Sequence, residues 1–359
     1  MTNETHQEML SLYRDQARRF VDESYGGLAV PRPYASEKGY SDDAYAAIAE
    51  LGWLGVCVPE ELGGLSGDLA AACVLMEAVG RGLVMEPVLP VLGLAARALA
   101  ACGNTGRLEA LTGGASLAVL LQAYQSSQPA IVGVSRGADG AVLLSGRVES
   151  VEAASAADEF LVAAKGEDGI VHLHALAASG EGVKIVSTRS FDGRLICDVT
   201  LDKVAAVRIS DGSDVTERLR AIIDEAALMT CAEAVGAMER VIEITAEYLR
   251  TRKQFRVPLA TFQSLQHRMV DMLLRFEEAR AVVEAALDAH GSAGFAKAQA
   301  LAKLVTARAA RFVASEGIQL HGGIGMTDEL NISRYFKRLL LCEHRFGDSD
   351  AFTKRYAAQ

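Results

Sequence analysis

Apolar and polar positions follow two different rhythms along the chain, and the change of rhythm divides it into three blocks. Up to about residue 118, apolar residues recur every three or four positions, which is typical of amphipathic helices. In the stretch 42–55, for example, these residues are Tyr45, Ile48, Leu51 and Leu54. We therefore expect an N-terminal α-helical domain over residues 1–118.

The middle block, residues 119–210, consists of short β-type runs separated by turns rich in Gly, Asp and Ser. Six such runs begin near residues 116, 140, 158, 171, 182 and 196. Short runs at such close intervals are typical of an antiparallel sheet or a small barrel. We therefore expect a β-domain over residues 119–210.

The last block, residues 211–359, returns to helical periodicity in long segments. Three of them cover about 214–255, 262–289 and 295–320. Long helices joined by short loops pack as a bundle. The sequence thus predicts an α+β protein with an N-terminal helical domain, a middle antiparallel β-domain and a C-terminal four-helix bundle.

Charge and composition exclude several classes of function. The net charge is 36 − 46 = −10, which disfavours binding to nucleic acid or to an anionic membrane. The six cysteines form no CxxC unit, so we expect a reduced, cytoplasmic protein. The first ten residues do not resemble a signal peptide. Charges and prolines interrupt the most apolar region, residues 69–102, so we expect no membrane span.

Two stretches of the last block have both a structural and a chemical interpretation. Arg252, near the end of a predicted helix, either complements the helix dipole or pairs with a phosphate. Gln263 is either an ordinary first-turn residue or a hydrogen-bond partner for a ligand. Gly322 and Gly323 follow another helix, where one glycine is a usual C-cap. Two adjacent glycines also let a ligand approach the backbone closely.

Taken together, these stretches resemble the acyl-CoA dehydrogenase family. The segments that carry the resemblance are YLRTRKQF, FQSLQHRMVDM and QLHGGIGMTDE, and the layout of the three blocks agrees over nearly the whole chain. The segments GRGLVMEP, CAEAVGAM and YFKRLLLCEHRFGD resemble in particular the small subunits of heteromeric acyl-CoA dehydrogenases, of the pimeloyl-CoA dehydrogenase small-subunit type.

The resemblance implies FAD as cofactor, an acyl-CoA as substrate and an electron-transferring flavoprotein as electron acceptor. In the family, one subunit's bundle holds the pyrophosphate and adenine end of a neighbour's FAD. The matching residues here are Arg252, Phe255, Gln263, Gln319, Gly322 and Gly323. Arg256 departs from the pattern, because the family usually has glycine after the phenylalanine.

The catalytic base that the family needs is missing from both of its usual positions. The reaction requires a carboxylate that removes a proton next to the thioester carbonyl. At the first position this chain has Phe346, and at the second it has Ala226. Glu225, next to Ala226, is either the base or a salt-bridged helix carboxylate. The catalytic residue therefore stays unknown.

The middle block also lacks the family's own-chain flavin segments. Neither motif is recognisable at residues 122–133 or at residues 150–152, where Glu152 stands near the expected ring position. We therefore favour the small subunit of an α₂β₂ complex whose partner supplies the glutamate. The alternatives are a self-sufficient homo-oligomeric enzyme and a non-catalytic binding member. His172 and His174 alternate on an expected strand, a position compatible with solvent exposure, and two such histidines alone are a weak metal signal.

Overall fold

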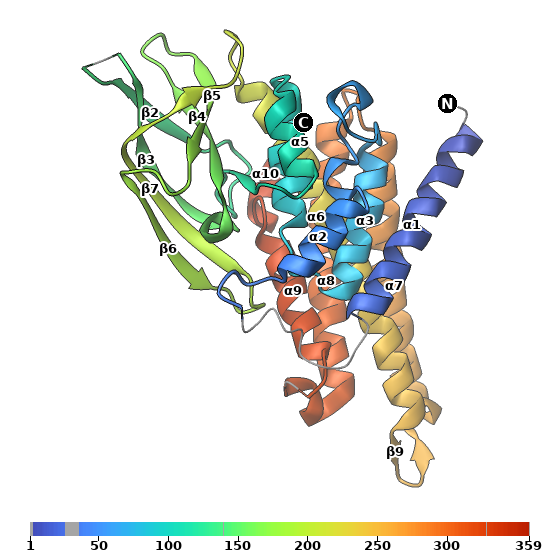
Figure 1. Cartoon of the computed structure of the whole chain (residues 1–359). Coiled ribbons are helices and arrows are strands. Elements are labelled where there is room, and N and C mark those ends of the chain that lie inside the picture. Colours follow the sequence, from blue (N-terminus) through green and yellow to red (C-terminus); the bar gives the residue numbers. More distant parts are fainter. Residues whose placement is uncertain (1–2, 26–35, 139, 328, 359) are drawn as a thin grey trace. The chain divides into compact units, whose positions relative to one another are not determined.

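The computed structural model describes residues 3–25, 36–138, 140–327 and 329–358 (Figure 1). The first block is helical, as predicted, and Pro87 and Pro90 accompany a π-helical turn. Its elements are α1 (Asn3–Tyr25), α2 (Asp42–Glu50), α3 (Leu69–Gly82), the π-helix (Leu89–Ala95), α4 (Ala96–Ala101) and α5 (Thr105–Thr112).

The second block forms one sheet in the order β6-β7-β3-β2-β4-β5-β8, with β1 beside β4. Its strands are β1 (Ala118–Leu120), β2 (Ile131–Arg136), β3 (Val142–Glu152), β4 (Glu159–Lys165), β5 (Val171–Ala177), β6 (Val183–Arg189), β7 (Leu195–Ala205) and β8 (Val207–Arg208). Most pairs are antiparallel, as predicted, but β4 runs parallel to β1 and β2. No apolar pattern in the sequence predicts β2, because its residues are mostly exposed or half-buried.

The third block is helical, and its long helices lie where the periodicity predicts them. Its elements are α6 (Thr216–Thr251), the hairpin β9 (Lys253–Gln254) and β10 (Val257–Pro258), α7 (Gln263–Asp288), α8 (Phe295–His321), a 3₁₀ turn (Gly322–Met326), α9 (Ile332–His344) and α10 (Ser349–Ala357). Among the described residues, no helix has both the length and the apolar character of a membrane span. No disulfide joins any of the six cysteines.

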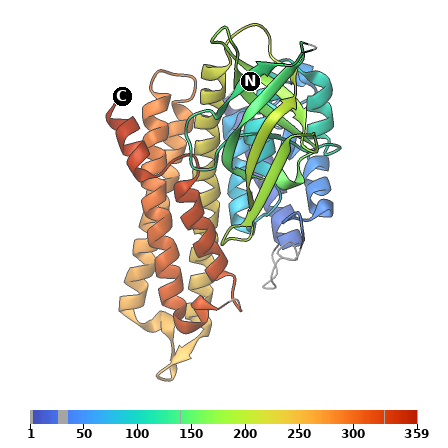
Figure 2. The same ribbon diagram turned by 90° about the vertical axis from the view of Figure 1, so that its left-hand side faces the viewer.

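By packing, the chain forms two compact units. The helical unit comprises the described parts of 1–31, 73–84 and 227–359, and the sheet unit those of 32–72 and 85–226. In the helical unit, α6, α7 and α8 run side by side (Figures 1 and 2). The three-domain division follows chain order and stays a prediction.

Two glycines allow α3 and α6 to touch backbone to backbone inside the helical unit. A Cβ atom on Gly80 would lie 1.8 Å from the carbonyl oxygen of Glu233. One on Gly236 would lie 1.8 Å from the carbonyl oxygen of Glu77. No side chain fits there, so these two glycines fix how closely α3 lies against the bundle.

Candidate cofactor-binding and active site

The residues expected to hold a cofactor lie together at one end of the helical unit. Arg252 directly follows α6, and its backbone N–H donates to the carbonyl oxygen of Tyr248 at 2.8 Å. Gln263 is the first residue of α7, and Gln319 lies in the last turn of α8. We call this set the clamp: Arg252, Phe255, Gln263, Gln319, Gly322 and Gly323.

The hairpin after Arg252 presents its tip to the surroundings. Gln254 pairs with Val257, so Phe255 and Arg256 form a two-residue turn. Their φ values are 51° and 70°, as a type I′ hairpin turn requires. Phe255 is 85% exposed. The Phe255 side chain is thus held outward, and a strained Arg256 follows it where the family usually has glycine.

The glycine turn after α8 has an open backbone. Gly322 has φ 67° and ψ −146°, a region that is essentially restricted to glycine. A Cβ atom added to Gly322 or Gly323 would meet nothing within 4 Å. The backbone is therefore accessible to a ligand from this side, which the ordinary role of a helix cap does not require.

Side-chain contacts join the helix ends that carry the clamp. The ring of Tyr248 stacks on that of His321, with centroids 4.4 Å apart. The Tyr248 hydroxyl donates to the His321 carbonyl oxygen at 3.2 Å. Nε of Arg268, in α7, lies 2.5 Å from the Glu316 carboxylate of α8. The sequence analysis missed Tyr248, whose only signal is its place one helical turn before Arg252.

The clamp has the donor set that the pyrophosphate end of FAD requires. The Arg252 side chain is exposed, and guanidinium groups bind phosphate oxygens through paired hydrogen bonds. The open glycines admit close contact with the backbone. These residues fit the pyrophosphate and adenine part of the cofactor.

At the first of the two positions where the family carries its catalytic glutamate, this chain has a buried phenylalanine. Phe346 is 2% exposed, and the Arg345 guanidinium lies 5.8 Å from its ring centre. Asp348, two residues on, caps α10 by accepting from the Ala351 N–H at 2.9 Å. A phenyl ring takes up no proton, so this position provides no base.

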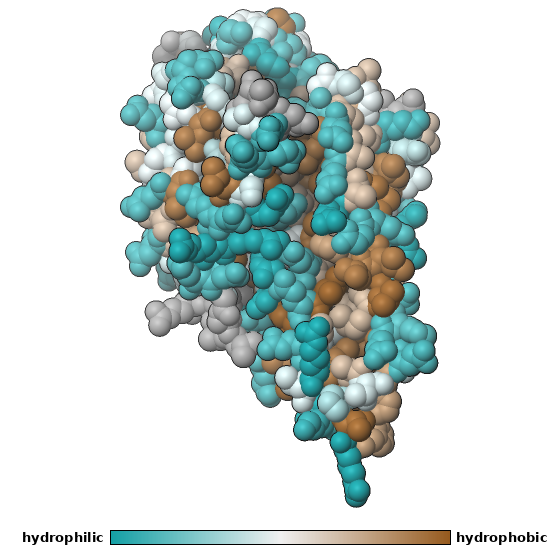
Figure 3. Space-filling view, turned by 90° about the vertical axis from the view of Figure 1, so that its right-hand side faces the viewer, coloured by the Kyte–Doolittle hydropathy of each residue, from teal (hydrophilic) through white to brown (hydrophobic). Residues whose placement is uncertain are grey.

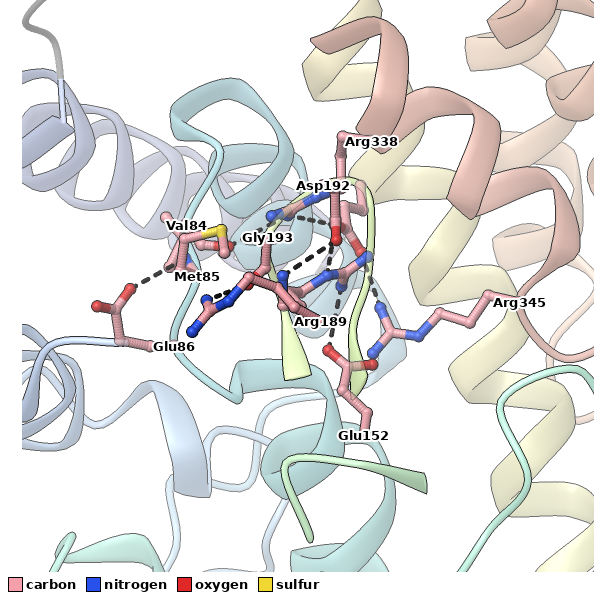
Figure 4. A network of polar contacts seen from close by, with 11 residues as sticks. Val84, Met85, Glu86, Glu152, Arg189, Asp192, Gly193, Arg338 and Arg345 are labelled. Atoms are coloured by element: carbon pink, nitrogen blue, oxygen red, sulfur yellow. Dashed lines mark hydrogen bonds and ion pairs between the residues drawn. The ribbon is translucent and has the colours of Figure 1, made fainter. Parts of the chain in front are cut away.

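The arginines around this position are themselves held by buried partners. Arg338 and Arg345 donate to the two oxygens of Glu233 at 2.9 and 3.1 Å, and all three side chains are at most 3% exposed. Arg338 also donates to the Val84 carbonyl oxygen at 3.1 Å (Figure 4). Buried charges of this kind are retained only when they are paired.

Glu225 forms an ion pair inside the sheet unit. Its carboxylate accepts from the Arg97 guanidinium, and Glu225 is 9% exposed. This contact favours the salt-bridge interpretation of Glu225. Sequence reasoning had no signal for Arg97, because the two residues lie 128 positions apart.

The sheet-unit segments that match the family's own-chain flavin motifs are engaged in local contacts. The Gln122 amide donates to the carbonyl oxygens of Ser126 and Gln128, at 2.8 and 3.1 Å. The N–H of Ser150 donates to Asp198 at 3.0 Å. These polar groups are occupied within the chain and do not fit a flavin ring.

Glu152 belongs to a further buried charge network of the sheet unit. Its carboxylate accepts from Arg194 at 3.1 Å, and Arg194 also donates to Asp192 at 2.7 Å. In the same turn, Arg189 donates to the Gly193 carbonyl oxygen at 2.9 Å (Figure 4). Glu152 therefore stabilises the β6–β7 turn.

His172 and His174 are buried and do not face solvent. Both lie on β5, as expected, but they are 6% and 3% exposed. Nδ1 of His174 lies 3.2 Å from the His172 carbonyl oxygen. Within the described residues, no group of three His, Cys, Asp or Glu side chains has the arrangement of a metal site.

A helical block, a sheet and a long-helix bundle form the layout expected of a flavin-dependent acyl-CoA dehydrogenase. Residues 5–107 match the model of the acyl-CoA dehydrogenase N-terminal domain, and residues 203–357 that of its C-terminal domain. The chain belongs to the acyl-CoA dehydrogenase family. The family is one of FAD enzymes, so the expected enzyme class and cofactor are confirmed.

Individual relatives align with this chain over almost its full length. The chain is 30% identical to acyl-CoA dehydrogenase IpdE2 of Mycolicibacterium smegmatis over 332 residues, 92% of each chain. It is also 30% identical to IpdE2 of Mycobacterium tuberculosis, over 93% of this chain and 92% of that protein. A solved Tcur3481–Tcur3483 steroid ACAD variant superposes with a TM-score of 0.86 at 28% identity, covering 98% of each chain. The expected likeness to heteromeric acyl-CoA dehydrogenase subunits is confirmed.

Proposed function

We propose that this chain is one subunit of a heteromeric acyl-CoA dehydrogenase and that its partner subunit supplies the catalytic carboxylate. The reaction is the α,β-dehydrogenation of an acyl-CoA thioester. The observation that carries the proposal is the contrast between Phe346, a buried aromatic at the base position, and the clamp, which is exposed and open.

In this proposal the clamp holds the FAD that is seated in the partner subunit. The chemistry that FAD supplies when bound is acceptance of a hydride from the β-carbon. Arg252 pairs with the pyrophosphate, Phe255 packs on the cofactor, and Gln263 and Gln319 offer hydrogen bonds. The open backbone at Gly322 and Gly323 admits the adenine end. The partner's carboxylate removes the α-proton.

An apolar face on α7 supports a partner subunit at this end of the molecule. Val270, Leu273 and Leu274 are 52%, 45% and 57% exposed, and their spacing places them on one side of the helix. Apolar side chains gather on the corresponding side of the molecule in Figure 3. Contiguous apolar surface of this kind marks interaction sites, and α7 begins next to the hairpin tip.

The relatives suggest the substrate class and the path of the electrons. The solved structure that superposes on this chain is named a Tcur3481–Tcur3483 steroid ACAD variant. We infer an acyl-CoA with a bulky, polycyclic acyl group, and an electron-transferring flavoprotein as acceptor.

The first experiment is the visible absorption spectrum of the chain purified alone and after co-expression with a second acyl-CoA dehydrogenase that retains the glutamate. We expect no flavin band that acyl-CoA bleaches from the chain alone, and such a band from the pair. A bleaching flavin band from the chain alone would contradict the proposal and favour a homo-oligomeric enzyme.

Glu225→Gln tests the self-sufficient alternative directly. In the active pair we expect kcat to change less than about twofold. Glu225 forms an ion pair with Arg97, and in this proposal it takes no part in proton transfer. A loss of the size typical of removing a general base, about 10²–10⁴-fold, would identify Glu225 as the base.

A further inference from the structure

A cavity of about 430 Å³ lies in the helical unit, beside the helix ends that carry the clamp. It is formed by the ends of α1, α3 and α8, the second half of α6, and the start of α9 with the two residues before it. Its apolar wall comprises Val21, Tyr25, Ile244, Leu330 and Tyr335. Small-molecule sites typically have volumes of about 300–1,000 Å³ and mostly apolar walls with few polar groups.

His321 contributes an acceptor without a partner to this cavity. The ring lines the cavity, and the residue is 3% exposed. Nδ1 lies 2.7 Å from the Gly317 carbonyl oxygen. A carbonyl only accepts, so Nδ1 carries the hydrogen and Nε2 is a bare acceptor. Nε2 has no hydrogen-bond partner among the described residues.

The protonation and orientation of His321 are both fixed by its surroundings. Burial lowers the pKa of His321, so the ring is neutral at pH 7. The stacked Tyr248 ring and the Nδ1 contact hold the plane of the imidazole. The cavity therefore calls for a ligand that brings an N–H or O–H donor.

The charged residues that line the cavity determine whether a cationic or an anionic ligand is favoured. Arg81 and Arg240 line the cavity, but each donates to Glu243 at 2.9 Å, and Arg81 also donates to Glu239. Asp22 and Glu247 line the cavity as well. Nε of Arg81 lies 3.6 Å from the Asp22 carboxylate, and Glu239 also accepts from Arg18. Glu243 and Asp22 therefore match the two arginines, and the further carboxylate of Glu247 favours a cation and opposes an anion.

We propose that this cavity, the His321 cavity, binds a small organic amine. The ammonium group donates to Nε2 of His321, its charge faces Glu247, and its apolar body lies against Tyr25 and Ile244. This site lies outside the proposed acyl-CoA chemistry and does not depend on it.

The test uses 2-phenylethylamine as probe and 3-phenylpropionate as the matched anion, with the full-length chain. In protein carrying ¹⁵N-labelled histidine, we expect the amine to move the Nε2 resonance of His321, and the anion to leave it unchanged. No shift with the amine, or a shift with the anion alone, would overturn the proposal. This measurement needs no variant and so is independent of any folding defect.

Variants locate the binding. Isothermal titration with the amine should show at least about tenfold weaker binding for His321→Leu and for Ile244→Trp, which fills the cavity. His267→Leu changes an exposed histidine of α7 outside the cavity and should bind as the parent does. Equal affinity in all three would place the amine elsewhere. A His321 shift caused by AMP and not by the amine would assign His321 to the cofactor clamp and refute the amine site.

Discussion

The clamp and the position of the missing base differ in how their polar groups are used. Around Phe346, the charges of Arg338, Arg345 and Glu233 satisfy one another in the interior. At the clamp, the Arg252 side chain and the Gly322 backbone face outward. Interior pairing stabilises this chain alone, whereas outward groups contribute only when something binds them.

This contrast separates stability from cofactor binding. Substitutions in the closed region should unfold the chain without a specific effect on FAD. Substitutions in the clamp should weaken FAD binding and leave the free energy of unfolding nearly unchanged. The four substitutions below test this separation, from the largest effect to the smallest.

Glu233→Gln tests the closed region. It removes the charge that two buried guanidinium groups share, and breaking such a pair costs about 3–5 kcal/mol. Urea unfolding should therefore show a free energy of unfolding lower by about that amount. Glu278→Gln is the control: Glu278 pairs with Arg275 on the surface, and surface pairs contribute about 0–1 kcal/mol. Equal losses in the two variants would mean that the interior network is not stabilising.

Glu77, in α3 of the same helical unit, is a carboxyl group whose pKa is set more by burial than by nearby positive charges. Burial raises the pKa of Glu77 to about 7, while Arg14 and Arg18 act in the opposite direction. The folded state therefore holds a proton that the unfolded state releases near pH 4.5. Stability should fall as pH rises from about 4.5 to 7, by up to about 3 kcal/mol at 1.36 kcal/mol per pKa unit.

Glu77→Gln should remove that decline. Urea unfolding at pH 4 should show little difference from the parent, and at pH 8 the variant should be the more stable protein. A parent and a variant with parallel stability–pH curves would contradict the raised pKa.

Arg252→Ala tests the open region. A hydrogen bond to a charged group contributes about 1.5–3 kcal/mol, so the FAD affinity of the subunit pair should fall about 10–100-fold. The free energy of unfolding of the chain alone should change by less than about 0.5 kcal/mol. Arg250→Ala removes an exposed arginine two residues earlier and should leave FAD binding unchanged. If both variants retain the parent affinity, Arg252 is only a helix-end cation.

The sequence predicted the elements better than the contacts between them. Helices α6, α7 and α8 have long apolar stripes, so their periodicity was visible. The strand β2 has no such pattern. Partners such as Arg97 and Glu225 lie far apart in the chain, and no local rule relates them. The six clamp residues were predicted from the resemblance of their local motifs to the acyl-CoA dehydrogenase family, and their role in binding FAD stays a prediction.

Arg256→Gly gives the smallest and most discriminating effect. Arg256 has φ 70°, a conformation that costs a non-glycine residue roughly 1–2 kcal/mol. Glycine removes this strain but also increases the freedom of the unfolded chain by up to about 1 kcal/mol. We therefore expect a small net stabilisation, below about 1 kcal/mol, in urea unfolding of the chain alone.

FAD binding by the same variant decides why the arginine is there. If Arg256 adds a second cation to the clamp, Arg256→Gly stabilises the free chain and lowers the FAD affinity of the subunit pair. The loss of affinity should be larger at low salt, because attraction between charges is then least screened. If residue 256 affects only the conformation of the hairpin turn, the variant binds FAD with the same affinity as the parent. The first result adds Arg256 to the clamp. The second leaves the clamp at its six residues and leaves the strain at Arg256 without a role in cofactor binding.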